Sequence, residues 1–494
     1  MTDTTLTAPS TPRPHLRATL ILACLAQFMV ILDVSVVNVA LPSIRGGLHF
    51  TEANLQWVVN AYTVTFAGFL LLGGRAADLL GRRRVFVAGL TLFALASLAG
   101  GLAHSQGMLI AARATQGLGG AVIAPASLSI LTTTFSEGAA RNRAVGIWGA
   151  MGGAGGAAGV LLGGVLTDTL GWRWILFINV PIALTAAFFT YRLVAEGRDT
   201  TRTRSFDLPG ALSATLGLSL LVLGIVRTDR TGWGSPATLG LIALGVVLLG
   251  VFVAIEGRFA RSPLMPLRIY SSRTLSASNI VVLLVGAATF GMWFFLSLYL
   301  QQVLGYSAIK AGLAFLPMTL MIVASSTFAS RKVIRFGTKP LLTAGMIAQT
   351  AGLLLFTRLP ADGSYLANVA LPGILVGIGI GLAFVPATIS AVAGVAPSEA
   401  GLASGLVNTA RLFGGALGLA ILAALATSRT NSDLAHAGGG VHGAHVALTA
   451  GFHAAFVVAA GFAIVGALVA ILGLPPVRLG SRVPSTQPAP DAAA

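Results

Sequence analysis

Residues 74–84 read Gly-Arg-Ala-Ala-Asp-Leu-Leu-Gly-Arg-Arg-Arg. This basic stretch joins two apolar stretches, 54–74 and 85–103, each about as long as the roughly 20 residues that a helix needs to cross a membrane. A second basic stretch, 330–339, reads Ser-Arg-Lys-Val-Ile-Arg-Phe-Gly-Thr-Lys, and it also places a glycine seven residues after its start. The two stretches indicate a chain built from two related halves, an arrangement typical of membrane transporters.

Long apolar stretches recur along the whole chain. Their approximate limits are 17–41, 54–74, 85–103, 108–134, 144–167, 172–194, 208–226, 237–256, 275–300, 311–330, 340–358, 365–394, 400–427 and 449–474. Only 9% of the 494 residues are charged, against about 25% in soluble proteins, which excludes a soluble enzyme and a nucleic-acid-binding protein. The stretches are continuous rather than alternating, so a β-barrel is not expected. We predict an all-α polytopic membrane protein with 14 transmembrane helices.

Basic residues predict how these helices are oriented. If the N-terminus is cytoplasmic, the cytoplasmic loops and tails carry 22 Lys and Arg, and the opposite loops carry 7. This asymmetry predicts that both termini lie in the cytoplasm, in a bacterial cytoplasmic (inner) membrane. The expected organisation is a disordered tail (1–15), a six-helix half (16–200), two inserted helices (201–262), a second six-helix half (263–474) and a tail (475–494).

Several motifs together resemble the major facilitator superfamily. Residues 74–84 resemble its signature loop between the second and third helices. Four further segments resemble motifs of one branch of this superfamily, the fourteen-helix drug:proton antiporters. They are Leu32-Asp-Val-Ser-Val-Val-Asn-Val-Ala-Leu-Pro42, Arg113-Ala-Thr-Gln-Gly-Leu-Gly-Gly-Ala121, Trp172-Arg-Trp-Ile-Leu-Phe-Ile-Asn-Val-Pro181 and Tyr299-Leu-Gln-Gln-Val-Leu-Gly-Tyr-Ser307. The resemblance covers about residues 20–475 and implies the major facilitator fold and drug export in exchange for protons.

Two charged residues inside the spans are the candidates for proton coupling. Asp33 is the only acid well inside a span, where a carboxylate costs at least about 2.5 kcal/mol and is functional by default. Arg113 stays protonated, and we expect it to face Asp33 across a central cavity. The alternative is that the pair is only structural.

Glycines and the basic loop predict helix contacts that change between conformations. The resemblance and the charge pattern assign a conformational latch to Gly74, Asp78, Gly81, Arg82 and Arg83. The fifth span carries glycines three and four residues apart, which form a smooth packing face. The packing residues are Gly149, Gly152, Gly156, Gly159, Gly163 and Gly164. Val160 stands where the related antiporters have proline, so the kink of that motif is absent.

The resemblance also suggests which helices line the substrate cavity. The candidates are Gln27, Asn38, Gln116, Asn279, Trp293, Phe294, Tyr299 and Phe384. Asn408 and Arg411 could form a polar contact between the halves, or they could be structural. Histidines 436, 442, 445 and 453 follow no metal-binding pattern, so neither a metal nor another cofactor is expected.

The sequence thus predicts a proton-driven exporter of hydrophobic or cationic drugs, not an enzyme. Its expected partners are drugs, protons and the lipid bilayer, but no nucleic acid, and we expect a monomer. Three alternatives stay open: export of a lipid or a dedicated metabolite, uptake by proton symport, and a membrane sensor or scaffold that transports nothing.

Overall fold

The structure is a computed structural model that describes residues 16–136, 139–197, 207–260, 263–393, 395, 399–435 and 441–475. Its helices are α1 (Leu16–Leu48), α2 (Glu52–Leu55), α3 (Trp57–Leu80), α4 (Arg82–Gly101), α5 (Gln106–Thr134), α6 (Ala139–Thr169), α7 (Trp174–Phe177), α8 (Asn179–Leu193), α9 (Leu208–Thr231), α10 (Pro236–Ala254), η1 (Ile255–Phe259), η2 (Leu267–Ser271), α11 (Arg273–Leu298), η3 (Tyr299–Val303), α12 (Ala308–Phe336), α13 (Thr338–Phe356), η4 (Tyr365–Ala370), α14 (Leu371–Ala393), α15 (Ala400–Leu434) and α16 (Val441–Gly473). The expected tails lie outside the described residues, apart from Pro475.

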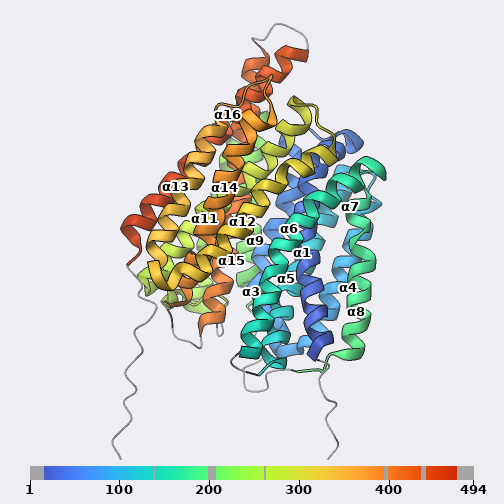
Figure 1. The fold of residues 1–494 in the computed structure, drawn as a ribbon, viewed down its shortest axis with the longest axis vertical. Helices are drawn as coiled ribbons and strands as arrows, with labels where there is room; N and C mark the ends of the chain where they lie inside the picture. Colours follow the sequence, from blue (N-terminus) through green and yellow to red (C-terminus); the bar gives the residue numbers. More distant parts are fainter. Residues whose placement is uncertain are drawn as a thin grey trace, which may run out of the picture.

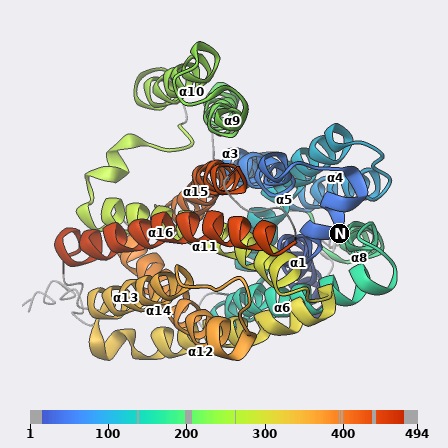
Figure 2. The ribbon, with the colours of Figure 1, turned by 90° about the horizontal axis from the view of Figure 1, so that it is seen from above.

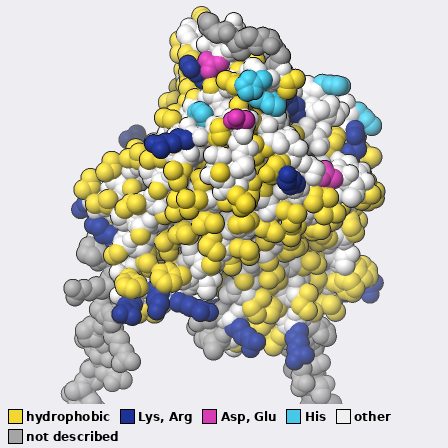
Figure 3. Space-filling view, turned by 45° about the horizontal axis from the view of Figure 1, so that its top comes forward, with side chains coloured by type: hydrophobic (Ala, Val, Ile, Leu, Met, Phe, Trp, Pro, Cys, Tyr) yellow, Lys and Arg dark blue, Asp and Glu magenta, His cyan; other side chains and the backbone are white. Residues whose placement is uncertain are grey.

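Fourteen helical segments within the described residues are long and apolar enough to cross a membrane, as the sequence predicted. Figure 3 shows hydrophobic side chains over the middle of the visible face, whereas Lys and Arg side chains lie toward both ends and acidic and histidine side chains lie toward the upper end. This is the surface that a bilayer requires, because lipid tails can contact apolar side chains but cannot solvate charged ones. The predicted all-α membrane fold is confirmed.

The helices form two sets that lie side by side (Figure 1). The first set contains α1 to α8, and the second contains α11 to α16. Helix α1 begins and α16 ends at the same end of the bundle, which we call the terminal end; the other end is called the distal end. Helices α9 and α10 pair with each other outside the bundle, and α9 also packs on α3 and α15 (Figure 2). The inserted pair therefore contacts both sets.

The repeated basic stretches have the same backbone geometry. Gly81 ends α3 with a φ of 111°, and Gly337 ends α12 with a φ of 81°. Glycine adopts these positive φ values without the steric cost that other residues pay. In both sets the glycine therefore lets the second long helix turn directly into the third.

Glycines on α6 allow two close helix contacts. A Cβ at Gly159 would lie 2.9 Å from the Leu32 carbonyl oxygen of α1, and one at Gly163 would lie 2.9 Å from the Val36 carbonyl oxygen. Gly164 faces α12 instead, where a Cβ would lie 2.6 Å from the Ala308 carbonyl oxygen. Helix α6 thus packs tightly on α1 and, near its distal end, on the second set.

The glycines nearer the start of α6 lie in open surroundings. No atom lies within 4 Å of a Cβ built at Gly149 or Gly152, and at Gly156 the nearest is the Ser35 hydroxyl at 3.8 Å. On other sides of the same stretch, a Cβ at Gly153 would lie 2.9 Å from the Val323 side chain of α12, and one at Gly155 would lie 2.7 Å from the Phe28 carbonyl oxygen of α1. The expected packing face is continuous in sequence, but it meets different surroundings along its length.

Hydrogen bonds also join the two sets at the distal end. The Ser297 hydroxyl donates to the Asn38 carbonyl over 2.6 Å, and the Gln301 amide donates to the Val39 carbonyl over 2.8 Å. The Asp168 carboxylate accepts the backbone N–H groups of Ala308 (3.1 Å) and Ile309 (2.8 Å) at the start of α12. These bonds satisfy backbone groups on one set with side chains of the other.

The α1–α6 contact predicts different effects for two glycines on one helix. In Gly159→Ala the new methyl group must displace the α1 backbone, so we expect about 1–3 kcal/mol of destabilisation. In Gly149→Ala the methyl group has space, and the lost backbone freedom of glycine predicts about 0.5–1 kcal/mol of stabilisation. Thermal unfolding in lipid nanodiscs measures both, and equal changes in the two variants would contradict the packing.

Candidate functional site

The Asp33 carboxylate lies in the middle of the first set, and it is fully buried. It accepts hydrogen bonds from three side chains on two other helices. Arg113 of α5 donates to Oδ2 over 2.7 Å, while Gln116 of α5 (2.7 Å) and Asn179 of α8 (2.8 Å) donate to Oδ1. We call these four residues the Asp33 cluster. Its hydrogen bonds tie α1, α5 and α8 together at one carboxylate.

Arg113 is held by contacts on several sides. Its Nε donates to the Val58 carbonyl over 3.0 Å, and its Nη1 donates to Gln116 Oε1 over 2.6 Å. Its guanidinium lies 4.5 Å from the centre of the Tyr62 ring, in a cation–π arrangement. Gln116 in turn contacts the Ser97 hydroxyl of α4 over 2.8 Å. The cluster therefore involves five helices of one set.

The geometry is compatible with two states of Asp33: an ionised carboxylate that pairs with Arg113, and a protonated carboxyl group that does not. An ionised carboxylate can accept all three donors, and Arg113 balances its charge. A protonated carboxyl group would remove that balance and leave the buried arginine without an acid. Protonation of Asp33 must therefore be accompanied by a change in the contacts of Arg113.

The sequence spacing of Arg113 and Gln116 predicted that both lie on one face of a helix. In the structure both side chains contact Asp33. Gln116 was expected to line a substrate cavity, whereas the structure places it in the cluster. The contributions of Asn179 and Tyr62 were missed. Asn179 is a polar residue inside a predicted span, which is a usable signal, but nothing in the sequence places it beside Asp33.

The 74–84 loop joins four helices at the terminal end. Arg82 Nη2 lies 3.3 Å from Asp78 Oδ1, and its Nε donates to the Ser129 hydroxyl of α5 over 2.7 Å. Ser129 also donates to Asp78 over 3.2 Å. Arg83 approaches Glu196, just after α8, at 3.6 Å. These contacts form within one set, so in this conformation the loop holds the terminal ends of α3, α4, α5 and α8 together.

Gly74 and Gly81 leave space for these contacts. A Cβ at Gly74 would lie 3.3 Å from Pro125 Cβ of α5. At Gly81 it would lie 2.6 Å from the Glu196 carboxylate, in addition to the strain of the positive φ. All five residues expected in the latch thus take part in, or make room for, one contact region.

Arg411 is a second cation at membrane depth. It lies on α15, half-buried, and its guanidinium contacts Asn408 Oδ1 from Nε (3.2 Å) and Nη2 (2.9 Å). The rings of Phe290 and Phe384 lie 6.0 Å and 5.6 Å from it. Among the described residues no carboxylate lies within ion-pair distance of Arg411, although an arginine in a membrane helix costs at least about 2.5 kcal/mol.

The remaining candidates for the substrate cavity differ in how deeply their side chains are buried. Phe294 and Tyr299 are fully buried; Tyr299 donates to the Pro360 carbonyl over 2.8 Å, and Phe294 packs edge-on against Phe295. Asn38 and Asn279 are also buried, and their side-chain amides donate to backbone carbonyls of their own helices. The half-buried residues are Gln27, whose Oε1 has no partner, Trp293, which stacks on Phe315, and Phe384 beside Arg411.

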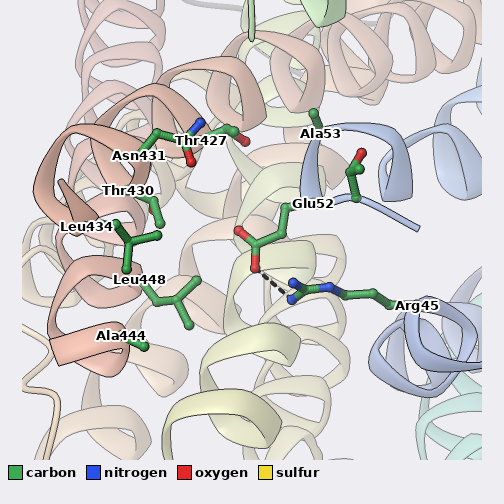
Figure 4. A pocket seen from close by; sticks show the side chains of 10 residues that line it. Arg45, Glu52, Ala53, Thr427, Thr430, Asn431, Leu434, Ala444 and Leu448 are labelled. Carbon is green, nitrogen blue, oxygen red and sulfur yellow. Dashed lines mark hydrogen bonds and ion pairs between the residues drawn. The ribbon is translucent and has the colours of Figure 1, made fainter. Parts of the chain in front are cut away.

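A pocket of about 490 Å³ lies at the distal end, between α1–α2 and α15–α16 (Figure 4). Arg45 and Glu52 form an ion pair of 2.7 Å at its wall, and Thr427, Thr430 and Leu434 of α15 face them. Arg45 also donates to Gln302 of the second set over 3.2 Å. The pocket therefore lies at the contact between the sets.

The histidines lie near the same end. His442 and His445 are on α16, where His453 contacts the Leu359 carbonyl over 2.6 Å, and His436 lies outside the described residues. Within the described residues, no three His, Cys, Asp or Glu side chains are grouped so that they could hold a metal ion.

Comparison with known proteins identifies the family. Residues 23–419 match the Major Facilitator Superfamily, and the chain belongs to it. It is 47% identical to the cephamycin export protein CmcT of Amycolatopsis lactamdurans over 84% of this chain and 86% of that protein. It is 42% identical to the puromycin resistance protein pur8 of Streptomyces alboniger over 88% of each. The protein is a multi-pass membrane transporter related to antibiotic exporters, and it is not an enzyme.

Solved structures show the same fold. The chain superimposes on a bacterial homologue of the lysosomal transporter Spinster with a TM-score of 0.66, over 93% of this chain and 98% of that one, at 16% identity. For the nucleoside transporter NupG the TM-score is 0.64 at 13% identity, over 92% and 99%. At such low identities the similarity concerns the fold alone.

The Asp33 cluster predicts a specific pattern of stabilities. Arg113→Met leaves a buried carboxylate without its cation, and we expect about 3–5 kcal/mol of destabilisation at neutral pH. The double variant Asp33→Leu/Arg113→Met removes both charges and should recover much of that loss. Thermal unfolding in nanodiscs measures all three proteins. A double variant less stable than Arg113→Met would contradict the buried ion pair.

Proposed function

We propose that this protein is a proton-driven exporter that exchanges hydrophobic drugs or antibiotics for protons. The observation that carries the proposal is the buried Asp33 carboxylate with Arg113 as its cation. Each proton that binds Asp33 weakens this ion pair, and each proton that leaves restores it. Proton transfer is thereby linked to the packing of α1 against α5 and α8.

The membrane potential can drive such an exchange. One elementary charge that crosses 100 mV releases about 2.3 kcal/mol. Because about 1.4 kcal/mol corresponds to a tenfold concentration ratio, one proton supports a drug gradient of roughly 50-fold. Asp33 is the only carboxyl group that we assign to coupling, so we expect few protons per transported molecule.

We place the terminal end in the cytoplasm, on the strength of the basic residues in the loops and tails at that end. With this orientation, the hydrogen bonds between the sets lie on the extracellular side, so the conformation is inward-facing. Residues 16–200 and 263–474 then act as two halves that rock against each other, with 201–262 inserted between them. The monomer suffices for this motion.

The proposal gives the 74–84 loop a role in that motion. Its contacts with Ser129 and Glu196 fix the cytoplasmic ends of four helices relative to one another. A half that rocks as a rigid body needs such contacts. In the outward-facing state we expect the loop to exchange some of them for contacts with the second half.

The relatives support antibiotics as the substrate class. One is described as a cephamycin export protein, another as a tetracenomycin C resistance and export protein, and another as a lincomycin resistance protein. These names favour export over uptake and over a role without transport. The second candidate is a transporter dedicated to a single antibiotic, since the relatives carry the names of individual compounds.

Proton coupling through Asp33 is tested in inside-out vesicles that are acidic inside and contain a pH-sensitive dye. Addition of puromycin, cefoxitin or ethidium should release protons from wild-type vesicles. Asp33→Asn keeps an acceptor and a similar shape but cannot ionise, so we expect it to abolish the drug-evoked signal.

The matched control is Asp433→Asn, because Asp433 pairs with the exposed Arg429 at 3.2 Å, outside the bundle interior. This variant should behave as wild type. Drug-evoked proton release that persists in Asp33→Asn at the wild-type rate would exclude Asp33 as the coupling group.

The distal contacts predict a shift in conformation for Asp168→Ala. The variant loses a cap on α12 that is supplied by the other half, at a cost of about 1 kcal/mol to the inward-facing state alone. We therefore expect the outward-facing population to rise about fivefold. Spin labels at the exposed positions His104 and Arg358, with Cys24 replaced by serine, report the distance between the halves by pulsed electron resonance.

Ser105→Ala is the control, because Ser105 caps α5 within its own half over 3.2 Å. It removes a similar cap but should leave the distance distribution unchanged. The same shift in both variants would show that Asp168 has no particular role in closing the extracellular side.

A further inference from the structure

Arg411 has surroundings that the proposed function does not use. Arg411 lies on α15, about 16 Å along the helix from the first residue and within a candidate membrane span. The side chain that hydrogen-bonds to the Arg411 guanidinium is Asn408. Asn408 is neutral and comes from the same helix. Nothing in the described part of the chain neutralises this cation.

The residues around Arg411 place it at the seam between the two halves. Its neighbour Leu412 belongs to the apolar cluster of the first half, although α15 belongs to the second. Phe290 of α11 packs against the same cluster and against a second apolar cluster that contains residues of both halves. The Arg411 side chain is half-buried.

Glycines fix the position of this cation and its aromatic neighbours. A Cβ at Gly286 of α11 would collide with the Arg411 carbonyl oxygen, and one at Gly415 would lie 2.8 Å from the Phe290 ring. Helices α11 and α15 therefore pack backbone to backbone at this level, and the Phe290 ring extends along α15 beside Arg411. Phe384 of α14 adds a second ring on the cation.

The charges inside the bundle do not balance. Asp33 and Arg113 neutralise each other, and Arg411 is left as one uncompensated positive charge. A cationic substrate would increase this charge, whereas an anionic substrate would neutralise it. A guanidinium binds a carboxylate through two parallel N–H···O bonds, and neighbouring rings can pack on the apolar part of the same molecule.

We propose that Arg411, with Phe290 and Phe384, binds the carboxylate of an amphipathic substrate in the central pathway. This inference rests on the proposed export function and names the substrate class for it.

The test compares three probes with purified protein in inside-out proteoliposomes under an imposed pH gradient. Cefoxitin carries a carboxylate, its methyl ester lacks that charge, and puromycin carries an amine. Wild type should transport cefoxitin about tenfold better than the ester, and Arg411→Gln should lose that preference while its ester transport changes little. Arg411→Lys, which keeps the charge without the planar fork, should retain an intermediate preference.

Arg429→Gln is the matched control, because Arg429 is an exposed arginine on the same helix. It should transport all three probes as wild type does. Thermal unfolding of each variant identifies loss of folding, and Arg411→Lys keeps the test decisive if Arg411→Gln does not fold.

Two results would overturn the inference: a folded Arg411→Gln that lowers transport of all three probes equally, or a wild-type protein that transports puromycin but not cefoxitin. The second result would leave the export function intact. Absence of transport for every probe would contradict the export function itself. In that case calorimetric binding of cefoxitin to detergent-solubilised wild type and Arg411→Gln still decides the role of Arg411.

Discussion

The structure depends on the need to satisfy one carboxylate in an apolar bundle. Asp33 is fully buried, and three donors from two other helices meet its oxygens within 2.8 Å. Arg113 is fixed in turn by Val58 and Tyr62 of α3. A change in the charge of Asp33 therefore alters contacts on several helices at once. In a secondary transporter, this is how the binding of a proton can change the stability of a whole conformation.

The helices of a transporter must pack tightly and still be able to move between conformations. Helix α6 meets α1 through glycines along its distal part, and it meets α12 through Gly164. The hydrogen bonds between the halves are concentrated at one end, where Asp168 caps α12 and Arg45 reaches Gln302. The contact between the halves is joined at its distal end, and Gly149 and Gly152 of α6 have open surroundings, which supports our proposal that the halves rock about this contact. Inside the halves, the Asp33 cluster and the 74–84 loop provide rigidity.

The sequence predicted the spans, the all-α membrane fold and the family, because apolar length and the motif spacing are local properties. It also placed Arg113 and Gln116 on one helix face. Asn179 could not be assigned to Asp33, since 146 residues separate them and only the packing of α8 on α1 brings them together. Phe294 and Tyr299 were candidates for the substrate cavity, but both are fully buried. An aromatic residue on a cavity helix can equally face the core, and the sequence does not decide which way it points. The unbalanced charge of Arg411 emerged only when its neighbours were known.

The most direct measurement is proton release on substrate binding to the purified protein in a weakly buffered detergent solution. If transport exchanges substrate for a proton on Asp33, saturation with a transported antibiotic must change the number of protons bound by the wild-type protein by up to one per chain. Asp33→Asn should bind the antibiotic without any change. Substrate binding that leaves the proton count of the wild type unchanged across pH 5–9, or equal proton exchange in Asp33→Asn, would contradict coupling through this carboxylate.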